Sequence, residues 1–394
     1  MDAPITTGGR PLNAVHRLSL RYLVVPPILL AILTALILFA HSDTNLPMLY
    51  SQCHARARLP WITHHVPVIA TPLCFLVSFF QEALASVRSA CIMSGVLSFI
   101  AGLLTVSTVE AARICNAPSI LIAYPTGAWL VFNLAGGAIV WQLVIIPAFF
   151  HRSREIILAR RQGVSDLTGP TDPNFGEQMR HLTKVAEIVA IPVAVAVGYI
   201  LPSILMIALN STDSAGITVL VWLLFPVWVS LIRQAIRKGM TLFLSDDWDA
   251  SFHLESSRLA LAGMYALPVL CSIVSHALFL YSFFRPNDEK EMTRATLKFI
   301  VIDAFFIALT TLYWLFVEAG WKVALVCVAA SVVAGPGAGI CVGWFYREAT
   351  VDPDRASVTV VAVGTSSSRR GSGNGDGSGA SSAHSSEETP LLRS

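Results

Sequence analysis

The stretch ACIMSGVLSFIAGLLTVSTV (residues 90–109) holds only apolar or small residues, and it ends directly at a group of polar ones. Such a stretch is long enough to cross the hydrocarbon core of a bilayer once as a helix. Glu110, Arg113 and Asn116 follow at intervals of three, and Tyr124-Pro125 comes soon after them. This spacing places a carboxylate, a guanidinium and an amide along one stripe of a helix, where they can meet. The sequence predicts a polar pocket inside a membrane protein.

The composition of the whole chain agrees with this prediction. Only 13% of the 394 residues are charged and 54% are hydrophobic, whereas an ordinary soluble domain has about 25% charged residues. Apolar segments recur along nearly the whole chain, which predicts an all-α, polytopic bundle in lipid rather than a globular domain with one anchor. A formal net charge of +2, without a basic cluster interleaved with aromatics, argues against nucleic acid as a partner.

Hydropathy predicts eight or nine transmembrane helices. The candidate crossings are 18–40, 66–86, 90–110, 127–150, 185–209, 216–236, 259–284, 298–318 and 323–346. The last two are separated only by Gly320-Trp321-Lys322, so the pattern leaves both numbers open. Three parts follow: a cytosolic segment at 1–17, the transmembrane bundle at 18–350, and a Ser/Gly-rich, disordered tail at 351–394.

The distribution of basic residues predicts the orientation. The loop 151–184 is the richest in arginine and lysine, so it is expected in the cytosol together with the N-terminus. The short loop 210–215 then faces the lumen, where Asn210 begins an acceptor sequence for a glycan. The tail ends in an acidic dileucine pattern at 387–392, which works as a sorting signal only in the cytosol, although nine crossings would place it in the lumen. An endomembrane location is expected, with the endoplasmic reticulum favoured.

Motifs for metals and cofactors are missing from the sequence, so none is predicted. The seven cysteines are scattered and are expected to be small buried hydrophobic residues rather than a disulfide framework or a zinc site. The run 246–249 (Asp-Asp-Trp-Asp) lacks the spacing of aspartate-rich diphosphate sites, and a solvated loop is the favoured interpretation. No P-loop and no dinucleotide glycine pattern is present.

Two of the carboxylates in the candidate crossings are the main candidates for a site, Glu110 and Asp303. An ionisable group at membrane depth costs roughly 2.5–3.5 kcal/mol, so it usually faces a cavity or a partner. Glu110 and Arg113 form either a structural ion pair or part of a site, and a buried pair is by itself a weak argument for stability. Asp303 lies in FIVIDAFF (299–306), with Lys298 as its nearest charge, and is the most isolated carboxylate. It either faces a cavity or bonds to another helix.

Other polar residues are weaker candidates. Glu82 lies near a predicted membrane boundary, where it could reach solvent instead of a substrate. His276 lies inside a crossing, where an interhelical hydrogen bond is the common role of a histidine. Glu187 and Glu318 lie at helix ends and are expected at the membrane interface.

Aromatic residues are abundant in and beside the crossings. Most are expected in interfacial belts or in packing, and a subset that faced a cavity could stabilise a carbocation by the negative face of the ring. The candidates are Trp129, Trp141, Trp222, Trp228, Tyr313, Trp314 and Trp344.

The stretch Glu110-x-x-Arg113-x-x-Asn116, followed by Ala123-Tyr124-Pro125 and an apolar helix to Pro147, resembles the fungal integral-membrane terpene cyclases typified by the ascofuranone cyclase. The run PLCFLVSFF (72–80) and the lone Asp303 followed by Trp314 are similar too, so the resemblance spans about 65–320. The chain departs from the family at Thr71, where an acidic residue is expected before the proline.

The resemblance implies cyclisation of the prenyl chain of a meroterpenoid, with or without a terminal epoxide, by protonation and without metal or redox cofactor. Glu110 is then the first candidate for the acid and Asp303 the second, which becomes the better one if Arg113 pairs tightly with Glu110. Arg113, Asn116, Glu82 and His276 would bind or orient a small hydrophobic prenylated substrate. Membrane lipid and other membrane enzymes of the same pathway are the further expected neighbours.

Two other functions suit the same residues. Intramembrane carboxylates and broken helices are also typical of a proton-coupled transporter or export protein of the pathway, although no internal repeat is visible. A receptor or a scaffold for other membrane enzymes is the third interpretation.

Overall fold

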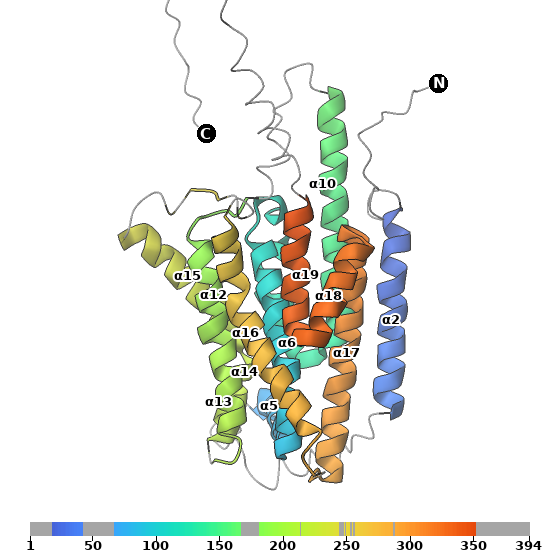
Figure 1. Ribbon diagram of the computed structural model, residues 1–394, viewed down its shortest axis with the longest axis vertical. Helices are drawn as coiled ribbons and strands as arrows, with labels where there is room; N and C mark the ends of the chain where they lie inside the picture. The colour runs from blue at the N-terminus through green and yellow to red at the C-terminus, as the bar shows by residue number, and fades with distance from the viewer. Residues whose placement is uncertain are drawn as a thin grey trace, which may run out of the picture. The chain divides into compact units, whose positions relative to one another are not determined.

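The structure is a computed structural model that describes residues 18–41, 67–166 and 181–351, except 213, 244–247, 249, 253, 255–256 and 287. These residues lie in one compact unit, Met1–Val351. Throughout these ranges the regular elements are helices, with no named strand, and the long helices run side by side as a bundle (Figure 1). The all-α class is therefore confirmed.

The helices fall into a few long rods and several broken ones. They are α2 (Leu20–His41), α5 (Pro67–Ala83), α6 (Val87–Ala111), η1 (Ile114–Asn116), α7 (Ile120–Ala123), α8 (Thr126–Ala135), α9 (Gly137–Val140), η2 (Trp141–Ile145), α10 (Ile146–Asp166), α12 (Glu187–Val195), η3 (Ala196–Ile200), α13 (Leu201–Ala208), α14 (Ala215–Leu223), α15 (Phe225–Phe243), α16 (Arg258–Ser282), α17 (Glu291–Ala319), α18 (Trp321–Ala334) and α19 (Pro336–Val351).

Within the described ranges, five spans are long and apolar enough to cross a membrane, and α14 with α15, bent by 64°, would make a sixth. The five are in α2, α6, the run from α12 to α13, α16 and α17. This finding supports a helical membrane protein. The expected number of eight or nine crossings is not confirmed. The expected crossing 127–150 is wrong as a single span, because Arg152 Nε, just after it, donates to the Cys115 carbonyl, before it, at 2.7 Å.

Two of the broken helices contain a π turn shortly before a proline. The π segment η2 ends at Ile145, two residues before Pro147, and η3 ends at Ile200, two residues before Pro202. Proline has no N–H to donate and its ring clashes with the carbonyl four residues earlier. A wider turn relieves that clash, which explains how the chain continues as a helix through both prolines.

The last expected crossing, 323–346, is wrong as a single span. The chain turns back at Gly335, whose φ of 89° suits glycine, so α18 and α19 form an antiparallel hairpin (Figure 1). Their 14 and 16 residues span about 21 and 24 Å, less than the roughly 30 Å of the hydrocarbon core. Arg347 on α19 bonds to Glu318 at the end of α17, so the hairpin begins and ends at one side of the bundle and makes no net crossing.

Three short extended segments close the end of the bundle where α6 stops. Leu182 pairs in antiparallel fashion with Arg113 on one side and with Phe252 on the other. The Leu182 amide donates to the Phe252 carbonyl at 2.8 Å, and the Thr183 amide donates to the Ala112 carbonyl at 2.9 Å. These bonds fix the segment that carries Arg113 against the loops that precede α12 and α16.

The cysteines agree only partly with the prediction. Five are free thiols, and four of these five are buried, as expected for small hydrophobic residues. Cys74 on α5 is disulfide-bonded instead, which corrects the expectation for that residue.

The hairpin makes a stability prediction at Gly339. A Cβ at this position would lie 2.7 Å from the backbone carbonyl of Cys327 on α18, so Gly339→Ala should overpack the hairpin and cost about 1–3 kcal/mol. Thermal unfolding of the purified protein in detergent should show a lower midpoint. Gly263→Ala on α16 is the matched control, because a Cβ there meets nothing within 4 Å. A Gly339→Ala protein as stable as this control would contradict the hairpin packing.

Candidate functional site

A cavity of about 460 Å³ lies in the middle of the bundle, a size in the range of small-molecule sites. Residues of α5, α6, α8, α14, α15 and α17 contribute most of its wall. Seven aromatic rings line it, and we call it the aromatic cavity: Phe75, Phe79, Phe80, Phe132, Trp222, Phe225 and Phe299. Several of the rings pack edge to face, such as Phe79 against Phe299 at 5.6 Å between centroids. The cavity suits an apolar ligand.

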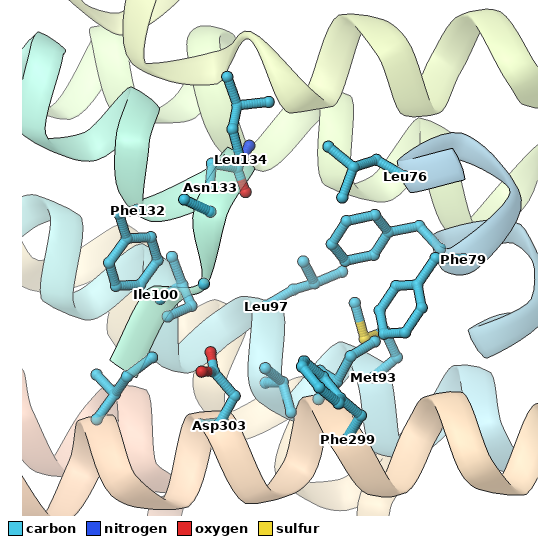
Figure 2. Close-up of a pocket in the computed structure, with 18 of the residues that line it drawn as sticks. Leu76, Phe79, Met93, Leu97, Ile100, Phe132, Asn133, Leu134, Phe299 and Asp303 are labelled. Atoms are coloured by element: carbon cyan, nitrogen blue, oxygen red, sulfur yellow. The ribbon is translucent and has the colours of Figure 1, made fainter. Parts of the chain in front are cut away.

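Asp303 is the one ionisable side chain among the lining residues of this cavity. It comes from the middle of α17, and Figure 2 shows its carboxyl group pointing into the space between Phe132 and Leu97. The Oδ1 atom accepts a hydrogen bond of 3.0 Å from the Ala138 amide. The two alternatives that the sequence left open for Asp303 therefore occur together: its carboxyl group faces the cavity and also bonds to another helix.

The Ala138 amide is available to donate to Asp303 because the helix is interrupted at Gly136. This residue has a φ of 120°, which suits glycine, and it separates α8 from the helix that begins at Gly137. The first amides of a helix have no intrahelical acceptor, and in a membrane such groups must be satisfied by protein. Asp303 supplies the acceptor at this break. The break also places Asn133, Gly136 and Gly137 in the wall of the cavity.

Glu110, Arg113 and Asn116 meet as the sequence predicted. Helix α6 ends at Ala111, so the contact forms across the turn that follows rather than along a continuous helix. The Arg113 Nε donates to Glu110 Oε1 at 3.0 Å. The Asn116 Nδ2 donates to the Glu110 carbonyl at 2.8 Å and to Oε2 at 3.2 Å.

The sequence did not predict the other half of this group, which comes from α17 and α19. Arg347 Nη1 and Trp344 Nε1 each donate to Glu110 Oε1 at 3.1 Å. Arg347 also pairs with Glu318 at 3.2 Å, and Arg113 pairs with Glu348 at 2.9 Å. We call these seven residues the polar cluster: Glu110, Arg113, Asn116, Glu318, Trp344, Arg347 and Glu348.

The polar cluster lies outside the aromatic cavity, since none of its members is a lining residue. Glu110 is 5% exposed, and both of its carboxylate oxygens accept hydrogen bonds within the cluster. Glu318, expected at the interface, is held between Arg347 and the Ser153 hydroxyl, which donates to it at 2.7 Å. Each acid is therefore matched to donors, which is the arrangement of a structural ion network.

A row of four buried tryptophans connects the cavity wall to the polar cluster. Trp129, Trp141, Trp314 and Trp344 are each at most 1% exposed. Successive ring centroids lie 5.8, 6.3 and 4.5 Å apart, and Phe132 of the cavity packs on Trp129 at 4.7 Å. Of the two expected roles, interfacial belts or packing, these four have the second, because each ring is buried against neighbouring rings.

Glu82, His276 and Asn210 lie outside the aromatic cavity. Glu82 accepts a hydrogen bond of 2.9 Å from Thr293 on α17, and the His276 ring stacks near Phe279 on its own helix. The Asn210 amide nitrogen, to which a glycan would be joined, donates to the Leu84 carbonyl at 3.0 Å. A glycan there would replace one of the two hydrogens of this nitrogen. Binding roles for Glu82 and His276 and glycosylation of Asn210 stay predictions.

In the part of the chain that the structure describes, no three His, Cys, Asp or Glu side chains gather as metal ligands would. The aspartates at 246, 247 and 249 lie outside that part.

We expect substitutions in the polar cluster to have coupled effects on the free energy of unfolding. Glu110→Gln and Arg347→Gln each remove one member of a buried ion network, which costs about 3–5 kcal/mol. The double variant should lose less than the sum of the two, because both changes remove the same contact between Glu110 and Arg347. Equilibrium unfolding in mixed micelles would measure this. Arg294→Gln, whose side chain is 60% exposed, is the control; additive losses would contradict the network.

Comparison with known proteins adds a family. A family model described as the CtvD domain matches residues 24–284, about two-thirds of the chain. The match includes Glu110, Arg113 and Asn116 and ends before Asp303. No curated protein and no solved structure matches the chain. The chain belongs to the CtvD domain family, which at a coarse level points to a terpene cyclase-type enzyme.

Proposed function

We propose that this protein is a membrane terpene cyclase that cyclises the prenyl chain of a meroterpenoid, as the resemblance to the ascofuranone cyclase implies. One observation carries the proposal: a single carboxyl group, that of Asp303, faces a cavity of about 460 Å³ whose wall is otherwise apolar and aromatic apart from Asn133. Acid-initiated cyclisation needs this combination of a positioned proton donor, a dry apolar space and rings that stabilise a cation.

Asp303 is a better acid than Glu110 on geometric grounds. A general acid must come within hydrogen-bond reach of the atom that it protonates. Asp303 reaches the cavity, whereas Glu110 is bonded to Arg113, Arg347, Trp344 and Asn116 outside it. We therefore assign the acid to Asp303 and a supporting role to Glu110.

The reaction balances as an isomerisation. Protonated Asp303 gives its proton to a terminal alkene or epoxide oxygen, and the C=C double bonds of the chain attack the resulting cation in turn to form the rings. The last cation loses a proton to the Asp303 carboxylate, which restores the acid. Neither oxidant nor metal enters this balance, and the product has the mass of the substrate.

The rings of the aromatic cavity would stabilise the carbocation by their negative faces. Phe132 and Phe299 lie on either side of Asp303 in Figure 2, on α8 and α17. A desolvated cation over an aromatic face gains about 2 kcal/mol or more. Trp222 also lines the cavity, so we assign it to the cation-stabilising subset of the aromatic residues.

We place the protein in an endomembrane, with the endoplasmic reticulum favoured, and with six crossings, which are the five long spans and the bent pair of α14 and α15. The basic loop 151–184 sets the cytosolic side, and the α18–α19 hairpin returns the chain to the side where α17 ends. This topology is compatible with a cytosolic sorting signal at 387–392. The disulfide at Cys74 supports an oxidising compartment, as secretory membranes have.

A transporter for a small metabolite is the alternative function, and the break at Gly136 favours it, because broken helices often form transport sites. A cyclase makes an isomer in membranes without any gradient. A transporter moves protons or substrate into sealed vesicles and leaves the substrate unchanged.

Asp303→Asn is the direct test of the acid. Asparagine keeps an oxygen for the Ala138 amide but has no proton to give, so cyclisation should fall by at least about 100-fold. Microsomes without added cofactors would receive prenylated and epoxyprenylated aromatics, and chromatography with mass spectrometry would detect a product of unchanged mass. Asp288→Asn, an exposed carboxylate in the turn before α17, is the control. Full activity of Asp303→Asn would refute this assignment.

Gly137→Ala tests the position of the same carboxyl group. A Cβ on Gly137 would lie 2.8 Å from Asp303 Oδ2 and 2.9 Å from the Phe132 ring, so the acid must move. We expect cyclisation to fall about 100-fold, as for other misplaced catalytic groups, with the protein still folded in the membrane. Gly127→Ala, earlier in the same segment and with nothing within 4 Å, should keep its activity. Equal rates for the two variants would argue against a catalytic Asp303.

A further inference from the structure

A second cavity, of about 470 Å³, has the opposite character to the first. It lies between α15, the end of α6, the segment around Tyr124 and residues 183–184. Four cationic residues line it and none of its lining residues is acidic: Lys184, Arg233, Arg237 and Lys238. We call it the basic cavity. A pocket with this charge attracts an anion.

Two of the four cationic residues pair with one buried carboxylate, that of Glu187. Glu187 is fully buried, and its two oxygens accept from Arg233 Nε at 2.7 Å and Nη2 at 2.8 Å. Arg237 Nη1 also reaches Glu187, at 3.2 Å. This corrects the expectation that Glu187 is interfacial. A bidentate pair uses one edge of a guanidinium and leaves its Nη1 donors for another acceptor.

Neutral donors complete the wall. The hydroxyl groups of Thr126, Thr183 and Ser230 are among the lining side chains. Helix α8 begins at Thr126, and no side chain caps this end. The unsatisfied amides and the positive dipole of a helix start favour an anion nearby, which adds to the charge of the α15 face.

The basic cavity is separate from the aromatic one. Trp129 lines the basic cavity and is 1% exposed, while Phe132 and Phe225 line the aromatic cavity. The Trp129 ring packs against these two rings at 4.7 and 6.0 Å. A ligand of the basic cavity is therefore a second ligand and not the far end of a prenyl chain in the first.

We propose that the basic cavity binds a phosphate group. Guanidinium and ammonium groups with hydroxyl and amide donors match the several acceptor oxygens of a phosphate monoester. The group could belong to a lipid headgroup or to a soluble phosphate. The position of the cavity on α15 favours the lipid. This helix bends 64° away from α14, and its Leu231 and Leu242 are 53% and 77% exposed.

The test uses the purified full-length protein and short-chain phosphatidic acid, with phosphatidylcholine of the same chain length as the comparison. Native mass spectrometry would measure the retained lipid. We expect phosphatidic acid to be retained at least about tenfold more than phosphatidylcholine, and Arg237→Gln/Lys238→Gln to lose that preference, because charge-assisted bonds are lost. Arg233 is kept, since it makes the bidentate pair with the buried Glu187, to which Arg237 adds one contact.

Lys290→Gln/Arg294→Gln on α17 removes the same charge from an exposed face and is the matched control. Lys238→Glu, a change at a side chain that needs no buried partner, should abolish the preference as well. Competition by millimolar inorganic phosphate would identify a soluble phosphate as the ligand, and lack of competition would identify the lipid. Equal retention of the two lipids, or equal losses in the α15 and α17 variants, would overturn the proposal. Because binding is read directly, the result is independent of cyclase activity.

Discussion

The hydrogen bond between the Asp303 carboxyl and the Ala138 amide is the contact on which the centre of this protein depends. A membrane helix cannot be interrupted without leaving amides that need an acceptor, and Asp303 provides one where the chain breaks at Gly136. The break opens the wall of the aromatic cavity, and the acceptor is the acid of that cavity. One side chain, that of Asp303, therefore both accepts from the amide that the interruption leaves free and places the proton donor in the cavity.

The polar cluster meets a different constraint at the end of the bundle. Burying Glu110, Arg113 and Arg347 costs desolvation free energy that their mutual attraction alone does not regain, so every donor needs an acceptor. The tryptophan row joins the cluster to the cavity wall without a gap, since its rings lie 4.5–6.3 Å apart. We infer that the cluster fixes α6, α17 and α19 against one another, and with them the helix that carries Asp303.

The sequence predicted the local part of this arrangement. A spacing of three residues brings Glu110, Arg113 and Asn116 together whether the helix continues or turns. A lone carboxylate among apolar residues predicted that Asp303 faces a cavity or bonds to another helix, and both are seen. Arg347 and Glu348 were missed because their partners are more than 200 residues away, which no periodicity encodes. The available signal was a charged pair three residues after Trp344, at the end of an apolar segment.

The hairpin of α18 and α19 was missed for another reason. Hydropathy measures how apolar a segment is and not whether its middle turns, so 323–346 scored as one crossing. Gly335-Pro336 was the local signal, because glycine allows the positive φ of a turn and proline suits the first position of the next helix. Proline alone was not a sufficient signal, because at Pro147 and Pro202 a π turn precedes the proline and the helix continues.

Asp303 differs from the other buried carboxylates in the kind of group that it bonds to. In the described part of the chain, the guanidinium groups of the polar cluster and of the basic cavity are anchored by carboxylates: Glu110, Glu318 and Glu348 in the first and Glu187 in the second. Asp303 is held by a backbone amide. A carboxylate in an ion pair must break that pair before it can carry a proton, and the vacated cation stays buried. A carboxyl group held by neutral donors can give up and recover a proton with its neighbours in place, as each turnover of a cyclase requires.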